Sequence, residues 1–407
     1  MRYASSRLDP VKPSASAWVS QAAQEARARG EDVIDLGVGE PDFDTPAHIK
    51  EAAHVAALNG ETKYPLTGGT ARLKAAISAK LRGENGLEYG PDGIIVSNGA
   101  KQVIFDALMA TLEPGDEVLL AAPYFGSYAD AVLMLGGKPV VIPCRAEDGF
   151  RLTPERLEGA LTERARWLFL NYPSNPAGAV YDESELRALG AIMRGRENLL
   201  LLADEIYEHI LFDGRAFRSF AAACPELKNR VLTVNGVSKA YAMTGWRIGY
   251  GAGPAPLIAA MTKVQSQISS GACSIAQAAA AAALEGPQDE VRRFRNAFEK
   301  RRNLVVERVA GIPGLRLAPP GGAFYALIEC GALIGATTPD GGVIGDDADL
   351  TAYLLTRAGV AAVPGAAYGI SPYFRISTAS SEEVLTQALE RIATAVGALR
   401  PKEVGVS

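Results

Sequence analysis

Residues 234–251 read VNGVSKAYAMTGWRIGYG, and this stretch decides the fold. The apolar run 231–234 leads into it and predicts a buried strand that ends at the turn-forming pair Asn235-Gly236. Lys239 follows that turn. Burial at the end of a strand lowers the pKa of a lysine because it disfavours the ammonium form, and a neutral amine can condense with an aldehyde. The stretch therefore predicts an attachment point for an aldehyde.

Two further residues of the stretch suit a phosphate group. Ser238 offers a hydroxyl beside the lysine, and Arg247 offers a planar guanidinium that can bind two phosphate oxygens. A Ser-Lys pair by itself is usually solvated surface, but here it lies in the pattern S-K-x5-G-x-R-x-G behind an apolar strand. Pyridoxal phosphate is an aldehyde with a phosphate tail, and we expect it as the cofactor.

The composition is that of a globular protein. Of the 407 residues, 48% are hydrophobic and 21% are charged, and this length predicts roughly two or three domains. The formal net charge is −5 with no basic run, so we expect no nucleic-acid partner. The longest apolar run, 278–284, is far shorter than the roughly 20 residues that cross a bilayer, and the N-terminus has no signal-peptide core. We expect a cytoplasmic protein that binds no membrane.

The cysteines and histidines form no metal or nucleophile pattern. Glu205 and His209 stand one helical turn apart, but two ligands do not make a metal site, and no Gly-x-Ser-x-Gly elbow accompanies the histidines. We expect neither a metal nor a histidine-based triad. The cysteines lack C-x-x-C and disulfide-ladder spacing, so we expect reduced, mostly buried thiols at Cys144, Cys224, Cys273 and Cys330.

Short apolar runs predict the strands, and amphipathic segments between them predict helices. The clearest helices are 17–29, 70–85 and 100–112, and the apolar runs are 33–36, 94–96, 117–121, 140–142, 167–170, 199–203 and 231–234. After Gly286-Pro287 a long amphipathic helix, 291–309, leads into a second domain with strands near 321, 363 and 374. Residues 337–349 are rich in glycine and acid, and we expect an exposed loop there.

Asp204 is a candidate ligand-binding residue, because open α/β sheets bind ligands at the carboxyl ends of their strands. It comes directly after the apolar run 199–203, where a carboxylate is costly to bury unless a cation faces it. The protonated ring nitrogen of pyridoxal would be such a cation, and the pair keeps the ring an electron sink. Tyr207, three residues on, could direct its hydroxyl at the phenolate of the same ring. The alternative role for Asp204 is a helix N-cap.

Three more segments offer groups that could bind pyridoxal phosphate. The glycine in the strand-to-helix junction 97–102 leaves unpaired main-chain N–H groups at a helix N-terminus, which suits a phosphate. Phe125, after the strand 117–121, is either a core residue or a platform for a flat ring. Asn175, in the proline-rich loop 171–178, either forms its own turn or donates to the phenolate.

Seven motifs resemble, in their order along the chain, the class I aminotransferases, which are pyridoxal-phosphate enzymes of fold type I: GEPDFDTP, NGAKQ, APYF, NYPSNPAG, ADEIY, SKAYAMTGWRIGY and FRIS. The resemblance covers nearly the whole chain. The lysine in NGAKQ and the segment TPDGGVIGDDADL are similar to the bacterial aspartate/prephenate aminotransferases. NYPSNPAG departs from the family pattern N-P-x-N-P-x-G by a tyrosine at the first proline.

The resemblance implies an α/β fold with two domains. The large domain, 48–287, would be a three-layer α/β/α structure with a mostly parallel sheet. A smaller α+β domain would be made of 1–47 and 288–407.

The resemblance also implies the contacts of the cofactor. Lys239 would hold pyridoxal phosphate as an imine and, once released, act as the general base. The phosphate would be bound by the main chain of Ala100 and Lys101 and by Tyr64 of a neighbouring subunit, which makes the protein a homodimer with shared active sites. The full set of implied cofactor residues is Tyr64, Ala100, Lys101, Phe125, Asn175, Asp204, Tyr207, Ser238, Lys239 and Arg247.

For the substrate, the resemblance implies two carboxylate sites. A main-chain N–H near Gly39 and the guanidinium of Arg375 would bind the α-carboxylate, and Lys101 would bind the distal carboxylate of a dicarboxylic substrate. Phe125 and Asn175 would line the same site. From the pattern around it alone, Arg375 faces either an anion or solvent.

The expected reaction moves an amino group from aspartate or glutamate to a 2-oxo acid such as 2-oxoglutarate, oxaloacetate or prephenate by a ping-pong mechanism. An aminotransferase of aromatic or neutral amino acids and a pyridoxal-phosphate β-lyase on the same fold would share nearly all of these residues. A transcription regulator with an aminotransferase-like domain would need an N-terminal helix-turn-helix segment, but the active-site pattern already begins at Gly37.

Overall fold

A seven-stranded sheet forms the centre of the computed structural model, which describes residues 3–401. Its strand order is β2-β8-β7-β6-β5-β3-β4, and β8 alone in this sheet runs antiparallel to its neighbours. The strands are β2 Ile94–Ser97, β3 Glu117–Ala122, β4 Lys138–Pro143, β5 Ala165–Asn171, β6 Leu200–Asp204, β7 Val231–Gly236 and β8 Gly249–Ala252. The expected mostly parallel sheet is confirmed.

Helices cover both faces of the sheet, because successive strand residues point to opposite faces. In β5, Leu168 and Leu170 pack into one apolar core, and Trp167 and Phe169 pack into another. The first core is covered by α2 Ala47–Leu58, α3 Ala71–Asn85, α6 Pro154–Ala160, α7 Glu183–Arg194, α8 Phe220–Ala223 and α10 Ser274–Glu285. The second is covered by α4 Ala100–Thr111, α5 Ser127–Met134 and α9 Ala255–Ile268. This is the expected three-layer α/β/α arrangement.

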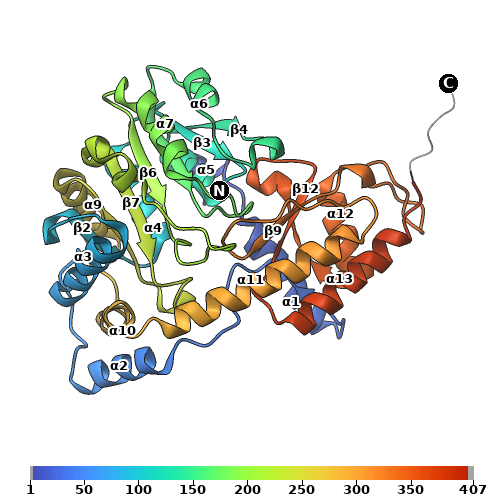
Figure 1. Ribbon diagram of the computed structural model, residues 1–407, viewed down its shortest axis with the longest axis horizontal. Coiled ribbons are helices and arrows are strands. Elements are labelled where there is room, and N and C mark those ends of the chain that lie inside the picture. The colour runs from blue at the N-terminus through green and yellow to red at the C-terminus, as the bar shows by residue number, and fades with distance from the viewer. Residues whose placement is uncertain (1–2, 402–407) are drawn as a thin grey trace.

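A second layered part with its own apolar core is built from both ends of the chain (Figure 1). Its strands form a two-stranded parallel sheet, β1 Ile34–Asp35 with β10 Val360–Ala361, and an antiparallel sheet in the order β11 Val363–Pro364, β12 Tyr373–Ser377, β9 Tyr325–Glu329. Its helices are α1 Ala15–Ala28, α12 Asp347–Tyr353, the π-helical turn Leu354–Ala358 and α13 Glu382–Gly397. In Figure 1 the long helix α11, Asp289–Ala310, runs between the two parts.

Short 3-10 helices complete the structure at Ser6–Leu8, Pro91–Gly93, Ala146–Asp148, Pro225–Arg230, Thr244–Trp246, Gly331–Leu333 and Gly365–Tyr368. The expectation of an exposed loop at 337–349 is wrong in part. Most of the segment is exposed, but Ile344 is buried in the core of the second part and α12 begins at the buried Asp347. Asp347 accepts hydrogen bonds from Ala366 N and Ser371 Oγ, which explains its burial.

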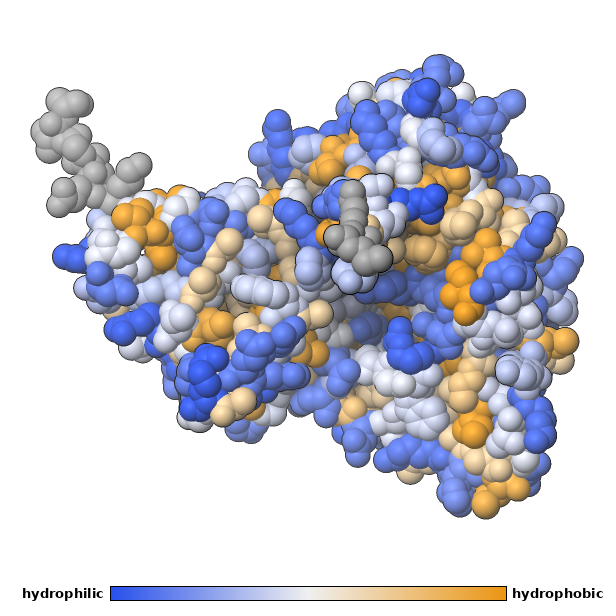
Figure 2. All heavy atoms as spheres, turned by 180° about the vertical axis from the view of Figure 1, so that it is seen from behind, coloured by the Kyte–Doolittle hydropathy of each residue, from blue (hydrophilic) through white to orange (hydrophobic). Residues whose placement is uncertain are grey.

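The surface is mixed in polarity. Figure 2 shows polar and charged side chains over most of the rear face, with apolar side chains in small groups between them. Within residues 3–401, no helix combines the length and the apolar character that a membrane crossing requires.

A buried ion pair fixes the turn that follows β6. The side chains of Lys80 on α3 and Glu208 in the turn are 2% and 4% exposed, and the ammonium donates to Glu208 Oε1. Asn85 Nδ2 and Asn235 Nδ2 donate to the same carboxylate at 2.6 and 2.7 Å. Because Asn235 belongs to β7, Glu208 ties together α3, the turn after β6 and the end of the strand that leads to Lys239.

We expect Lys80→Met to lower the free energy of unfolding by about 3–5 kcal/mol at pH 7, because it leaves the Glu208 carboxylate buried without its cation. Burial by itself raises the pKa of Glu208, but the charges of Lys80 and His209 and the hydrogen bonds of Lys80 and Asn85 outweigh it and hold this pKa at about 2. A carboxyl group whose pKa is lower in the folded than in the unfolded state stabilises the fold at pH values above its unfolded-state pKa. That stabilisation is lost as the pH falls through the folded-state pKa. The deficit of the variant should therefore be smaller at pH 3.5 than at pH 7, as measured by urea unfolding.

The double variant Lys80→Met/Glu208→Gln removes the uncompensated charge and should recover at least half of the loss. Lys50→Met, at an exposed position of α2, is the control for removal of a surface ammonium. An unchanged deficit in the double variant would contradict the ion-pair explanation.

Candidate active site

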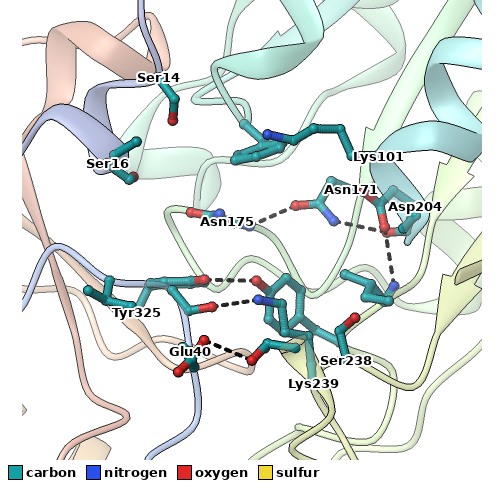
Figure 3. Close-up of a pocket in the computed structure, with 18 of the residues that line it drawn as sticks. Ser14, Ser16, Glu40, Lys101, Asn171, Asn175, Asp204, Ser238, Lys239 and Tyr325 are labelled. Atoms are coloured by element: carbon teal, nitrogen blue, oxygen red, sulfur yellow. Dashed lines mark hydrogen bonds between the residues drawn. The ribbon is translucent and has the colours of Figure 1, made fainter. Parts of the chain in front are cut away.

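A cavity of about 390 Å³ lies at the carboxyl ends of β5, β6 and β7, and both layered parts contribute to it (Figure 3). The pairing of β5 with β6 places Asn171 directly beside Asp204, and β7 on the other side leads into Lys239. Most of the residues expected at the site line this cavity: Gly39, Ala100, Lys101, Phe125, Asn175, Asp204, Tyr207, Ser238, Lys239, Arg247 and Arg375. Tyr64 does not, and its side chain is 93% exposed elsewhere on the surface.

Lys239 is partly buried in the wall of the cavity, and its Nζ donates to the main-chain oxygen of Gly39 (2.5 Å). Burial lowers the pKa of this amine to about 8. The charges of Arg375 and Arg247 act in the same direction as burial, and those of Glu40 and Asp204 act against it. The residue expected to react as an amine is therefore one that loses its proton close to neutral pH.

Asp204 ends β6 with its carboxylate buried, 6% exposed. Burial raises its pKa to about 6, and hydrogen bonds from Tyr128 Oη to Oδ2 (2.5 Å) and from Ile206 N to Oδ1 (3.3 Å) oppose that rise. No helix begins in the turn 205–210, so the N-cap alternative is wrong. The carboxylate instead faces the cavity.

Arg375 on β12 is 1% exposed, and no carboxylate of the described residues lies within ion-pair distance of it. Its guanidinium donates to Asn175 Oδ1 (3.0 Å), to Ser16 Oγ (3.3 Å) and to the main-chain oxygen of Gly37. Its Nε is buried without a partner. A buried, always-charged group that finds only neutral acceptors in residues 3–401 is a site for an anion. The solvent-facing alternative for Arg375 is excluded by its burial.

Asn175 and Tyr207 are held by neighbouring side chains. Arg375 occupies the amide oxygen of Asn175, so the amide NH₂ is the end that can donate to a ligand in the cavity. The hydroxyl of Tyr207 bonds the hydroxyl of Tyr325 (2.8 Å). Asn171, beside Asn175 in Figure 3, donates from Nδ2 to the main-chain oxygen of Asp204 (3.0 Å). Both expected phenolate donors therefore have fixed positions.

The N-terminus of α4 forms the anion-binding end of the cavity. Gly99, at φ 85°, precedes the helix, and the first N–H groups of a helix, here those of Ala100 and Lys101, have no acceptor within it. Arg247 lies against this junction, since a Cβ on Gly99 would fall 2.3 Å from Arg247 Nη2. Ser238 lines the same cavity. Two N–H groups, a hydroxyl and a guanidinium thus converge where a phosphate fits.

One end of the cavity carries the side chains of Lys101 and Phe125. Lys101 Nζ lies 5.1 Å from the centroid of the Phe125 ring, and burial together with the charge of Arg247 lowers the pKa of this lysine. Ser14 and Ser16, from the start of the chain, face this end of the cavity in Figure 3. A cation and two hydroxyls together suit a second anionic group.

Several residues of the site carried no signal that sequence reasoning used. Tyr128 stands one helical turn beyond Phe125, and Tyr325 begins β9 in the motif GGAFY. Four others are Ser14 and Ser16 at the start of α1, Glu40 in the loop after β1, and Asn171 at the end of β5. Of these residues, Tyr128 could most easily have been predicted from the sequence, because an aromatic three residues after a candidate ring platform points to the same side of a helix.

One cluster has the composition of a metal site. Glu84, Glu208 and His209 bring their ligand atoms within 4.8 Å of one another. The ammonium of Lys80 already contacts both glutamates, and His209 Nε2 bonds Glu84 Oε2 (2.8 Å). The cluster is an ion-pair network rather than a cation cage.

The cavity brings together a buried lysine, a buried carboxylate and an anion-binding helix end, and comparison with known proteins assigns the family. The family model "Aminotransferase class I and II" matches residues 31–392, and the chain belongs to this family. The aspartate aminotransferase of Rhizobium meliloti (strain 1021) is 52% identical over 96% of this chain and 95% of its own length. The aspartate/prephenate aminotransferase of Cereibacter sphaeroides is 49% identical over 96% and 98%.

A solved structure has the same fold. The crystal structure of the aspartate aminotransferase from Rhizobium meliloti superimposes with a TM-score of 0.95, at 51% identity, over 98% of this chain and all of that one (100%). The expected class I aminotransferase fold is confirmed, and the chain is an aminotransferase.

We expect Tyr128→Phe to raise the pKa of Asp204 above its value of about 6, because the variant removes the hydroxyl that stabilises the charged carboxylate. A hydrogen bond to a charged group contributes about 1.5–3 kcal/mol, so the rise should be about one to two pH units. The carboxyl carbon resonance of Asp204, titrated by NMR in the cofactor-free protein, measures it. Tyr124→Phe, a neighbouring tyrosine that does not bond Asp204, is the control. A midpoint at or below the wild-type value would contradict the role of Tyr128.

Proposed function

We propose that this aminotransferase binds pyridoxal phosphate in the 390 Å³ cavity. The observation that carries the proposal is the convergence on one cavity of Lys239, of the buried Asp204 and of the anion-binding end at α4. The phosphate would lie on the N–H groups of Ala100 and Lys101, with Ser238 and Arg247 beside it. When bound, the cofactor supplies an electron-withdrawing ring that stabilises negative charge at the substrate Cα.

The remaining chemistry belongs to side chains of this chain. Asp204 would hold its carboxylate against the ring nitrogen, where a cationic partner would lower its pKa from about 6 and hold it charged. Asn175 and Tyr207 would donate to the ring oxygen. Lys239, with a pKa of about 8, would take the proton of the substrate Cα at Nζ and would then donate it to the former aldehyde carbon of the cofactor.

Arg375 orients the substrate. Its guanidinium is buried and held by Asn175 Oδ1 and Gly37 O, so it presents a fixed fork to the α-carboxylate. Gly39 lines the same wall and would add a main-chain N–H. Phe125 would stack on the ring of the cofactor. These contacts hold the Cα–H bond of the substrate within reach of Lys239.

We propose a dicarboxylic amino acid, aspartate or glutamate, as the amino donor, and a 2-oxo acid such as 2-oxoglutarate, oxaloacetate or prephenate as the acceptor. Lys101, with Ser14 and Ser16 across the cavity from it, supports a second carboxylate beside the Lys101 ammonium. The names of the two relatives, aspartate aminotransferase and aspartate/prephenate aminotransferase, support the same class of substrate. The alternating use of one site by donor and acceptor is the basis of the ping-pong order.

We also propose a homodimer whose subunits each divide into a large domain, 48–287, and a small domain, 1–47 with 288–407. The exposed side chains of Tyr64 and Leu66, 93% and 75%, lie on the large domain and support a contact surface there. A surface groove of about 590 Å³ borders Arg247. A second copy that inserts its Tyr64 into this groove would bring a hydroxyl to the phosphate-binding guanidinium.

We expect borohydride to fix pyridoxal phosphate to Lys239 in the purified yellow protein, because reduction of an imine leaves a stable secondary amine. Mass spectrometry of the Lys239 peptide detects the product. Lys239→Ala should lower the rate of amino transfer by about 10³-fold or more, since it removes both the attachment point and the base. Lys50→Ala is the matched control. A near wild-type rate in Lys239→Ala, or reduction at another lysine, would reject the mechanism.

We expect Lys101→Ala to raise KM for aspartate by about 10–100-fold and to leave KM for alanine within about threefold, because only aspartate has a second carboxylate to lose a charged hydrogen bond. Steady-state kinetics with the two donors and 2-oxoglutarate measures the difference. Equal effects on both donors would refute the distal role of Lys101. Ammonia release without a 2-oxo acid would instead favour a β-lyase.

A further inference from the structure

Glu40 is a carboxylate at the mouth of the cavity that has no role in the function proposed above. Its side chain is exposed, and its Oε2 accepts a hydrogen bond from Thr244 Oγ1 (2.7 Å). Glu40, Thr244 and Lys239 line the same cavity. In Figure 3 Glu40 lies next to the side chain of Lys239, on the side away from Asp204. The bond from Thr244 fixes the carboxylate at this position instead of leaving it free in solvent.

The amine of Lys239 is bound to the same piece of backbone. Its Nζ donates to the main-chain oxygen of Gly39 (2.5 Å), which is the carbonyl of the peptide bond that joins Gly39 to Glu40. The lysine amine therefore contacts the peptide group that precedes the Glu40 side chain. Thr244 lies five residues after Lys239 in the same segment. The segment that carries the lysine therefore bonds both Gly39, through Lys239, and Glu40, through Thr244.

The other charged groups around this amine come from three different elements. Arg375 on β12 and Arg247 after the 3-10 helix Thr244–Trp246 are cations, and both act to lower the pKa of Lys239. Asp204 at the end of β6 is an anion, but Tyr128 and the main chain already occupy its oxygens. The Tyr207 and Phe324 rings, 5.9 and 5.7 Å from Nζ, complete the surroundings. Glu40 is the anion on the solvent side of the lysine.

We propose that Glu40 is a positioning residue for Lys239, whose carboxylate holds the ammonium form of the free lysine against the loop at the mouth of the cavity. The proposal deepens the proposed function and rests on it, because it concerns the lysine while it is not attached to the cofactor. Burial and two guanidinium groups make this amine a weak base. Glu40 opposes them and keeps it basic enough to take a proton, and among the charged groups it has the largest effect.

The experiment measures the protonation of Lys239 directly in the cofactor-free full chain. A lysine-acylating reagent such as acetic anhydride labels neutral amines, and mass spectrometry of the Lys239 peptide after labelling over a pH series gives the midpoint. We expect a wild-type midpoint near 8. Glu40→Gln should lower that midpoint by about half a pH unit or more, since an opposite charge nearby favours the charged form. The difference should shrink in 1 M salt, because Glu40 is exposed.

Glu51→Gln, an exposed carboxylate on α2 outside the cavity, is the control for net charge. Glu40→Asp keeps the charge and should retain most of the wild-type midpoint. An unchanged midpoint in Glu40→Gln, or an equal shift in Glu51→Gln, overturns the proposal. Borohydride trapping of pyridoxal phosphate in the same variants separates the role of Glu40 from the proposed function. Normal trapping at Lys239 together with an unchanged midpoint in Glu40→Gln rejects only the role of Glu40. The absence of trapping in the wild type rejects the proposed function.

Discussion

The burial of ionisable groups around one cavity is the constraint on which the rest of this structure depends. Arg375 and Asp204 are almost completely buried, and neither has an ion-pair partner among residues 3–401. Charges in such places cost stability, because water solvates them better than neutral donors and acceptors do. The chain therefore folds with charges that only a ligand can pair, and a ligand that pairs them stabilises the folded state by mass action.

The sheet order explains how these charges meet. Strands β5, β6 and β7 are parallel neighbours, so Asn171, Asp204 and the loop after Gly236 leave the sheet at one edge. The antiparallel β8 then returns the chain from Arg247 through the sheet beside β2, which leads to Gly99 and the start of α4. Arg375 comes from the separate sheet of the second part, and α11 connects the two. A site assembled this way requires both parts.

The sequence predicted site residues best where a reactive or charged residue directly follows an apolar strand. Asp204 and Lys239 each follow an apolar run, and a buried strand end is a local property that periodicity reveals. Tyr128 and Tyr325 were missed because their partners, Asp204 and Tyr207, are 76 and 118 residues away along the chain. Lys80 looked like an ordinary helix lysine, and only the packing of α3 against the turn after β6 makes it a buried cation. Non-local pairs of this kind leave no periodic trace in a single sequence.

The turn 205–208, which carries the cavity residue Tyr207, is held in place by side chains that lie outside the cavity. In the sequence Tyr207 lies between two buried carboxylates, Glu205 and Glu208, which have different partners. Glu208 accepts from Lys80 and Asn235, and Glu205 accepts from Tyr172 Oη (3.0 Å) and Ser219 Oγ (2.8 Å). Burial, together with the charge of Glu208, raises the pKa of Glu205 to about 7, so the neutral hydroxyl donors suit it.

This arrangement also explains the departure from the family pattern at NYPSNPAG. The tyrosine at the position of the first proline is Tyr172, and its hydroxyl reaches Glu205, the residue directly after Asp204. The loop that carries Asn175 is thereby bonded to the turn that carries Tyr207. A proline has no side-chain donor and would leave Glu205 with one partner fewer. The tyrosine thus adds a side-chain hydrogen bond between the segment of Asn175 and the turn of Tyr207, beside the bonds that Asn171 Nδ2 and Tyr172 N donate to Asp204 O.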